Sequence, residues 1–118
     1  MIASEVVAYI AGFFDGEGSA SFVWYVRKPG GKKYGKLEAK IAQQDKKVLD
    51  WIRRVVGFGR IHGYPERGKR RIVYHFVVQC EQARQFLALI RPYLRVKKTR
   101  VDEVIRLDAR HCKRRLAT

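Results

Sequence analysis

The sequence has little cysteine and no long apolar run. Its two cysteines, Cys80 and Cys112, have no paired spacing, which excludes a disulfide framework and a zinc knuckle. We expect both thiols to be reduced and to pack as small apolar groups. The longest apolar run, residues 6–14, is about half the length of a membrane span, and the N-terminus lacks the basic lead of a signal peptide. These absences predict a soluble, intracellular protein.

Acidic residues are also scarce. The 118 residues include 26 Lys and Arg but only 11 Asp and Glu, which gives a formal net charge of +15. Such a charge repels itself unless a polyanion compensates it, so nucleic acid is the first candidate partner. The apolar content of 47% excludes a disordered chain, and the length allows one domain, residues 1–118. The positive charge gathers in residues 19–43, 59–79 and 91–118.

The first 18 residues predict a helix that ends in glycines. Ser4 can cap the N-terminus of this helix, and Gly16 and Gly18 end it. Residues 6–14 place no charge on any face. A helix without a polar face is expected to be buried all round.

Alternation of apolar and polar residues predicts two hairpins, and longer periods predict further helices. The expected strands cover residues 19–27, 36–43, 60–64 and 71–78. Their apolar faces carry Ala20, Phe22, Trp24 and Val26, then Leu37, Ala39 and Ile41, then Ile72, Tyr74, Phe76 and Val78. The further helices lie between the cap Asp45 and Gly57, over residues 81–90, and from the cap Thr99 to His111. The order is αββαββα, an α+β fold with an antiparallel sheet, followed by a basic C-terminal helix and tail at about residues 97–118.

Asp15 and Glu17 lie where the first helix ends, and their charge is unfavourable there. The C-terminal end of a helix carries negative partial charge and unpaired carbonyl groups, so a cation is needed nearby. Mg²⁺ prefers carboxylate and carbonyl oxygens, and Gly16 and Gly18 let backbone and ligand approach closely. A metal site is one interpretation. The other is a turn in which Asp15 bonds to the backbone and Glu17 pairs with a surface lysine.

Residues 10–18 (IAGFFDGEG), followed by Ser19, resemble the LAGLIDADG motif of homing endonucleases. The likeness continues, in order and spacing, in residues 44–45 (QD), 58–61 (FGRI) and 92–97 (PYLRVK). It therefore covers most of the chain.

The resemblance implies a unit whose antiparallel sheet forms a saddle over duplex DNA, with the motif helices of two units packed together. One motif in the chain implies a homodimer through the first helix. The small residues Ala8 and Gly12, four apart, would allow such close helix contact. The expected interface residues are Ala8, Tyr9, Gly12 and Gly16.

The resemblance also implies a metal-dependent active site. Glu17, at the eighth motif position, corresponds to the essential metal ligand, one from each subunit, with the Gly16 carbonyl assisting and Asp15 structural. The expected cofactor is Mg²⁺ or Mn²⁺, because metal ions stabilise the attacking and leaving oxygens when water cuts a phosphodiester. Gln44 and Lys97 match catalytic positions that organise the attacking water and the charge near the phosphate.

One position departs from the pattern of the family. Val48 stands where some relatives have a basic residue a turn into the second helix. The neighbouring Lys46 or Lys47 is a candidate to replace that charge.

The polar strand faces and the basic loops form the expected DNA surface. Arg can bind guanine with two hydrogen bonds, Glu can accept one from cytosine, and Lys in loops favours phosphate. Two units side by side would cover some fifteen base pairs or more, so the target is expected to be long and pseudo-palindromic. The candidate DNA-binding residues are Ser21, Tyr25, Arg27, Lys28, Lys32, Lys33, Lys36, Glu38, Lys40, Arg60, His62, Tyr64, Arg67, Lys69, Arg70, Arg71 and His75.

The main hypothesis is a homodimeric, metal-dependent endonuclease that makes a staggered double-strand cut in double-stranded DNA. Such a protein would be associated with DNA in a prokaryotic cytoplasm or an organelle, with no membrane partner and no small-molecule substrate. Asp15 with Glu38 and Lys40 also matches a restriction-enzyme-like D…ExK arrangement, which would cut DNA with different residues. Two non-cutting alternatives are a DNA-binding regulator and an intron RNA-splicing maturase.

Overall fold

The computed structural model describes residues 1–117, with side chains for residues 1–111. The expected basic tail beyond His111, including the side chain of Cys112, lies outside the described side chains. The elements in chain order are α1 (Ser4–Glu17), β1 (Gly18–Val26), β2 (Lys33–Gln43), α2 (Lys46–Val56), β3 (Arg60–Pro65), β4 (Ile72–Gln79), α3 (Cys80–Ile90), the 3₁₀ helix η1 (Arg91–Tyr93) and α4 (Lys98–Ala117). The predicted α+β order is confirmed. None of these helices is long and apolar enough to span a bilayer.

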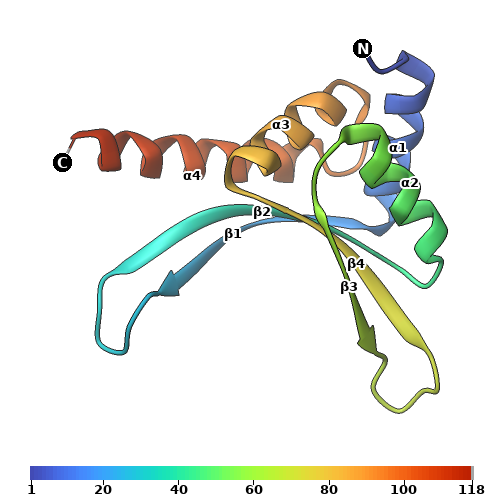
Figure 1. Cartoon of the computed structure of the whole chain (residues 1–118). Helices are drawn as coiled ribbons and strands as arrows, with labels where there is room; N and C mark the ends of the chain where they lie inside the picture. Colours follow the sequence, from blue (N-terminus) through green and yellow to red (C-terminus); the bar gives the residue numbers. More distant parts are fainter. Residues whose placement is uncertain (118) are drawn as a thin grey trace.

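The strands form one antiparallel sheet in the order β1-β2-β4-β3. The hairpins β1–β2 and β3–β4 diverge like two arms, and the helices lie together on one side of the sheet (Figure 1). We call β1–β2 the first arm and β3–β4 the second arm. The face of the sheet that borders the space between the two arms is the concave face. The predicted antiparallel saddle is confirmed.

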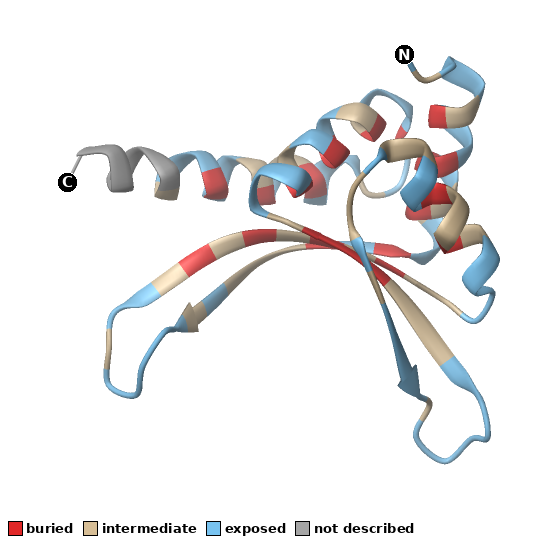
Figure 2. Ribbon diagram, in the orientation of Figure 1, coloured by how far each residue is buried: buried red, intermediate tan, exposed pale blue. Residues whose placement is uncertain are grey.

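The core lies between the sheet and the helices. Leu37, Ala39 and Ile41 of β2 are buried there, as the alternation predicts. The Phe86 ring of α3 packs against Phe14 of α1 and Phe76 of β4, with ring centroids 5.9 and 5.6 Å apart. Figure 2 shows the buried residues gathered where the arms cross beneath the helices, whereas the ends of the arms are exposed.

Two of the three predicted helix caps are wrong. The α1 cap is Ala3, without a side-chain hydrogen bond, and α4 begins one residue before Thr99. Asp45 does cap α2, because its carboxylate accepts the N–H of Lys47 at 3.0 Å. Residues that favour caps are also found in the first turn of a helix, so sequence alone places a cap only to within one or two positions.

Several apolar side chains predicted to be buried are exposed. Trp24, Val26 and Ile72 are 55%, 48% and 49% exposed, because the arms extend beyond the helices that cover the middle of the sheet (Figure 2). Cys80 is exposed at the first position of α3 instead of packed.

α1 is not buried all round either. Val7, Ile10, Ala11 and Phe14 are buried in the core, but the opposite face of the helix is exposed. An uncovered face without charges indicates a surface that a partner can cover.

Candidate functional site

The C-terminal end of α1 is fixed to the segment that precedes α4. The Asp15 carboxylate accepts hydrogen bonds from the backbone N–H groups of Arg95, Val96 and Lys97 at 2.8, 3.2 and 3.0 Å. In return, Lys97 Nζ donates to the carbonyl oxygens of Asp15 at 2.7 Å and Phe14 at 3.3 Å. We call these contacts the Asp15–Lys97 clasp.

The clasp supplies the cation that the end of α1 requires. The ammonium group of Lys97 lies at the negative end of the helix dipole. Burial opposes ionisation of Asp15, but the backbone hydrogen bonds and the Lys97 charge outweigh it and hold the pKa of Asp15 below its ordinary value. Both carboxylate oxygens of Asp15 are used by these N–H groups. These contacts favour the structural role expected for Asp15 over a metal-binding role in a D…ExK arrangement.

Glu17 is exposed at the last position of α1. Among the side chains of residues 1–111, none forms a hydrogen bond or ion pair with its carboxylate, so the predicted alternative of a Glu17–lysine pair is not observed there. Gly16 is exposed as well, and a Cβ atom built on it meets no atom within 4 Å. In this part of the chain no three His, Cys, Asp or Glu residues gather to hold a metal ion.

Gln44 lies at the same end of the sheet as Glu17. Gly18 pairs with Ile41 across the first arm, and Gln44 follows β2 directly. Its side-chain oxygen accepts a hydrogen bond from Arg71 at 3.4 Å. Gln44 is thus linked to the second arm, whereas Lys97 is linked to α1.

The concave face of the first arm combines aromatic rings with positive charges. Tyr25 lies opposite Tyr34 with ring centroids 5.8 Å apart. The Arg27 guanidinium lies 4.3 Å from the Tyr34 ring centroid, and Lys36 Nζ lies 5.1 Å from that of Tyr25. Lys32 Nζ, in the loop, lies 5.9 Å from the Tyr34 ring.

The register sorts the other candidates of the first arm. It pairs Ser21 with Glu38 and Ser19 with Lys40, which places these side chains on the concave face with Tyr25. Lys33 pairs with Val26 within the strand and alternates onto the opposite face. Lys28 and Lys32 lie in the exposed loop between the strands.

Tyr34 is a residue of this face that the sequence analysis missed, because β2 was expected to start at Lys36. The alternation of Tyr34, Lys36, Glu38 and Lys40 is the signal that could have identified it.

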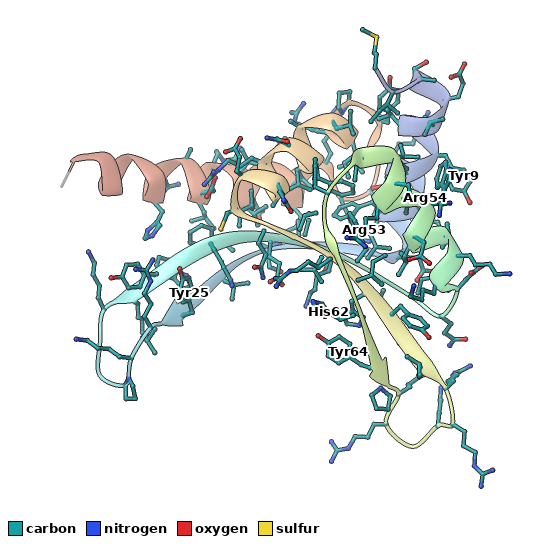
Figure 3. The ribbon with its side chains drawn as sticks, in the orientation of Figure 1. Tyr9, Tyr25, Arg53, Arg54, His62 and Tyr64 are labelled. Atoms are coloured by element: carbon teal, nitrogen blue, oxygen red, sulfur yellow. The ribbon has the colours of Figure 1, made fainter. Side chains whose placement is uncertain are left out.

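The concave face of the second arm carries an imidazole–phenol cluster. His62 pairs directly with His75 across β3 and β4. The Tyr64 ring lies 5.0 Å from that of His75 and 6.3 Å from that of His62. Figure 3 shows His62 and Tyr64 on the second arm and Tyr25 on the first turned toward the space between the arms. Arg60 alternates onto the same face and donates to the side chain of Gln79 at 3.2 Å.

The β3–β4 loop carries the remaining basic candidates. Its acidic residue, Glu66, pairs with Lys69 at 3.3 Å and Arg71 at 2.7 Å. The Arg71 hydrogen bond, partly offset by burial, holds the pKa of Glu66 below its ordinary value. Arg67 and Arg70 are exposed in the same loop, where they can reach a phosphate backbone.

The exposed face of α1 is built from small residues and one ring. Ala8, Gly12 and Gly16 are all exposed and follow each other at four-residue spacing. Beside them, the Tyr9 ring packs edge-on against Trp51 of α2, with centroids 5.6 Å apart. These rings and Val48 line a groove of about 520 Å³ between α1 and α2. The interface residues predicted from the sequence thus share one exposed, largely apolar surface.

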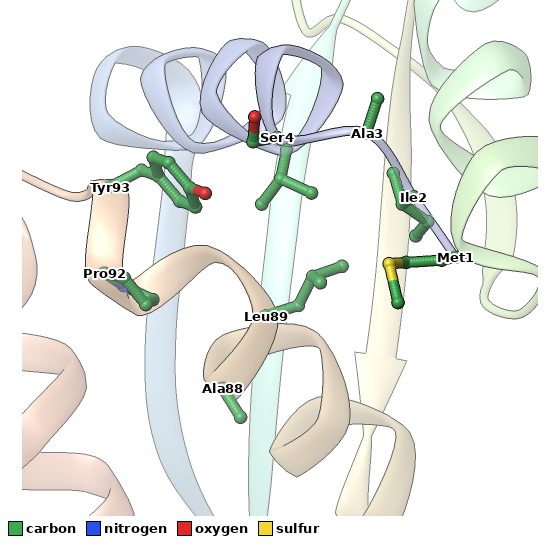
Figure 4. A pocket seen from close by; sticks show the side chains of 9 residues that line it. Met1, Ile2, Ala3, Ser4, Ala88, Leu89, Pro92 and Tyr93 are labelled. Carbon is green, nitrogen blue, oxygen red and sulfur yellow. The ribbon is translucent and has the colours of Figure 1, made fainter.

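A second groove, of about 660 Å³, lies between the start of α1 and the end of α3 (Figure 4). Its lining includes Ile2, Leu89, Pro92 and Tyr93 but no acidic or basic side chain. It offers no carboxylate, imidazole or thiol side chain that could hold a metal ion.

Comparison with known proteins identifies the family of this chain. The sequence model of the family described as LAGLIDADG endonuclease matches residues 10–103. The chain belongs to this family. The resemblance carried by residues 10–18 is thereby confirmed.

Solved structures of LAGLIDADG homing endonucleases have the same fold. I-CvuI in complex with the I-CreI target matches at 20% identity and a TM-score of 0.75, over 89% of this chain and 66% of that chain. The archaeal intron-encoded I-Vdi141I in complex with DNA matches at 25% identity and a TM-score of 0.70, over 89% of this chain and 67% of that chain. The meganuclease I-SmaMI bound to DNA matches at 19% identity and a TM-score of 0.70, over 87% of this chain and 36% of that chain. No curated protein matches the sequence.

Proposed function

We propose that the chain is a site-specific homing endonuclease that works as a homodimer. In this proposal it makes a staggered, metal-dependent double-strand cut in a long, pseudo-palindromic DNA target. The LAGLIDADG family and the DNA complexes of similar structures support DNA as the substrate.

One observation carries the proposal: the exposed small-residue face of α1 ends at the Glu17 carboxylate, which pairs with none of the described side chains. Ala8, Gly12 and Gly16 let a second α1 approach closely, because none of them has a side chain larger than a methyl group. Tyr9 and Trp51 add aromatic area beside that contact. Two-fold packing along this face would bring the two Glu17 residues together at the same end of the helix pair.

The groups at the end of α1 fit a divalent metal ion. Glu17 offers a carboxylate without a partner among the described side chains, and the exposed Gly16 beside it offers a backbone carbonyl. Oxygen ligands of this kind suit Mg²⁺ or Mn²⁺. A single free carboxylate is a weak site, so the partner subunit and DNA phosphates are expected to complete it.

When bound, the metal ion would stabilise the charge that develops as the phosphodiester is cut. The residues of this chain have separate tasks around it. Glu17 holds the ion, and the Asp15–Lys97 clasp fixes the helix end that carries Glu17. We expect Gln44, at the same end of the sheet, to orient a water molecule. The basic loops of both arms bind phosphates and hold the duplex against the concave face.

Cleavage of a large randomised duplex library tests the proposal. The purified chain is incubated with Mg²⁺, with Ca²⁺ or with EDTA, and every cut end is sequenced. We expect cuts at one long, near-palindromic sequence with Mg²⁺ and none with EDTA. Retention of selected duplexes without cutting would contradict the endonuclease proposal and favour a DNA-binding regulator.

A further inference from the structure

The two arms carry different kinds of side chain on the concave face. The first arm carries lysine side chains on this face, Lys36 and Lys40. The second arm carries His62 and His75 as a direct cross-strand pair, with Tyr64 beside them. Histidine is the side chain whose charge changes near physiological pH, so the positive charge of the second arm can depend on pH.

The surroundings of His75 disfavour a proton in the absence of DNA. Burial, the charge of Lys40 and the neighbouring His62 together hold the pKa of His75 below its ordinary value. On β2, Ala42 lies directly opposite His75, and on β3 the charged or titratable neighbours on this face are Arg60, His62 and Tyr64.

No acidic group of the described chain compensates this cluster. Glu38, the acidic residue on this face of β2, pairs with Gln79 further along the sheet. Its carboxylate accepts from Gln79 at 2.7 Å and lies 3.6 Å from Lys40 Nζ. A polyanion on the concave face would provide the missing negative charge.

We propose that His62 and His75 take up protons when the second arm binds duplex DNA. The phosphate backbone stabilises the imidazolium form, and each charged ring then donates hydrogen bonds from both nitrogens. Binding of DNA and binding of protons therefore reinforce each other. The inference rests on the proposed DNA-binding function and adds a pH control to it.

The direction of the effect follows from linkage. The pKa of His75 is low in the free chain and should rise beside phosphates. At pH values between the free and the DNA-bound pKa, binding of DNA is therefore accompanied by uptake of a proton. DNA affinity should then increase as pH falls, by up to about tenfold per pH unit for each proton taken up. Lys and Arg do not titrate in this range and contribute no such slope.

The test measures binding of the full chain to a labelled duplex of mixed sequence, without divalent metal so that no cutting occurs. Dissociation constants are measured at constant ionic strength from about pH 8 to about pH 6, a range that includes the ordinary pKa of histidine. We expect the wild-type constant to fall by about tenfold or more over this range. The double variant His62→Gln and His75→Gln keeps two polar side chains but cannot take up these protons, so its slope should be much flatter.

His111→Gln is the matched control, since it removes the third histidine of the chain, which lies against Phe22 and Trp24 of β1. This variant should keep the wild-type slope. Calorimetry in two buffers of different ionisation enthalpy counts the protons directly, and the count should fall only in the double variant.

The outcomes separate the two proposals. Equal slopes and equal proton counts in wild type and double variant would overturn the inference while DNA binding stands. Loss of duplex binding at every pH in the wild type would overturn the proposed function, and the inference with it. A folded double variant, checked by its unfolding curve, ensures that a flat slope reports the missing imidazoles.

Discussion

Lys97 Nζ lies 2.7 Å from the backbone carbonyl oxygen of Asp15, and the Lys97 N–H donates to the Asp15 carboxylate at 3.0 Å. Each residue thus binds the other through one backbone and one side-chain group. The pair joins the end of α1 to the segment before α4, two parts of the chain that are far apart in sequence. Because Glu17 stands two residues beyond Asp15, the same contacts set the position of the candidate metal ligand.

Asp15→Ala should destabilise the fold because three backbone N–H groups would lose a charged acceptor. We expect the free energy of unfolding to fall by about 1–3 kcal/mol, measured by urea denaturation. Asp50→Ala is the control, since Asp50 forms an exposed ion pair with Lys46 on α2 and should cost no more than about 0.5 kcal/mol. Equal losses in the two variants would contradict a structural role for the clasp.

The contribution of Asp15 should also depend on pH. Its folded pKa lies below its unfolded value, so its stabilisation is complete above the unfolded pKa of about 3.9. That stabilisation is lost as pH falls through the folded pKa. The difference in unfolding free energy between wild type and Asp15→Ala should therefore shrink in acid. A difference that stays constant from neutral pH to about pH 3 would show that the carboxylate charge is not involved.

Glu17→Gln should abolish cutting and leave DNA binding intact. The amide keeps the shape of the side chain but is a poor ligand for a hard cation, so we expect a loss of more than about a hundredfold in cleavage rate. Affinity for DNA without metal should stay within about threefold, because no described side chain pairs with the Glu17 carboxylate and an acidic group is not expected to bind phosphate directly. Both values come from gel-based cleavage and binding assays on one duplex.

Glu38→Gln is the matched control for Glu17→Gln, since Glu38 lies on the concave face and is held by Gln79. We expect it to change base preference while cutting continues. Loss of cutting in Glu38→Gln with retained cutting in Glu17→Gln would overturn the proposed site.

The sequence predicted the local structure well because the periods of strands and helices are local. Alternation identified the strands of both arms, and apolar spacing identified the helices between them. It missed the start of β2 at Lys33, because Gly35 interrupts the apolar face of that strand. The structure explains the glycine: a Cβ at this position would collide with the Phe22 ring.

The site was harder to predict than the fold. The motif in residues 10–18 pointed to Glu17, whose role stays a prediction, but no local pattern shows that Asp15 binds the amides of residues 95–97. Such a contact depends on how distant elements pack. The resemblance pointed to Ala8, Tyr9, Gly12 and Gly16 as an interface, and all four are exposed. Composition alone could not separate this face from the buried one, since an uncharged helix looks the same in sequence whether its own chain or a partner covers it.

Gly12→Ala should have opposite effects on the single chain and on the dimer. A Cβ at Gly12 meets no atom within 4 Å in the chain, and alanine favours a helix interior by up to about 1 kcal/mol. At the proposed interface the same methyl group would separate two closely packed helices. We expect slightly higher stability in urea and a dimer dissociation constant raised by about tenfold, measured by sedimentation. Ala109→Leu, on the exposed side of α4, is the control that should leave dimerisation unchanged. Unaltered dimerisation in Gly12→Ala would exclude this face as the interface.

Gly59→Ala and Gly57→Ala together test how the second arm is attached to the core. Both glycines have positive φ, +108° and +88°, so each alanine costs about 1–2 kcal/mol in backbone strain. Only at Gly59 would the new Cβ also collide with the Phe76 ring, and overpacking adds about 1–3 kcal/mol. Gly59 directly precedes β3, so relief of the collision must move the arm that carries His62 and Tyr64. We expect Gly59→Ala to be the less stable variant in urea and to bind duplex DNA more weakly than Gly57→Ala. Equal stability and equal affinity in the two variants would show that the position of the second arm does not depend on this contact.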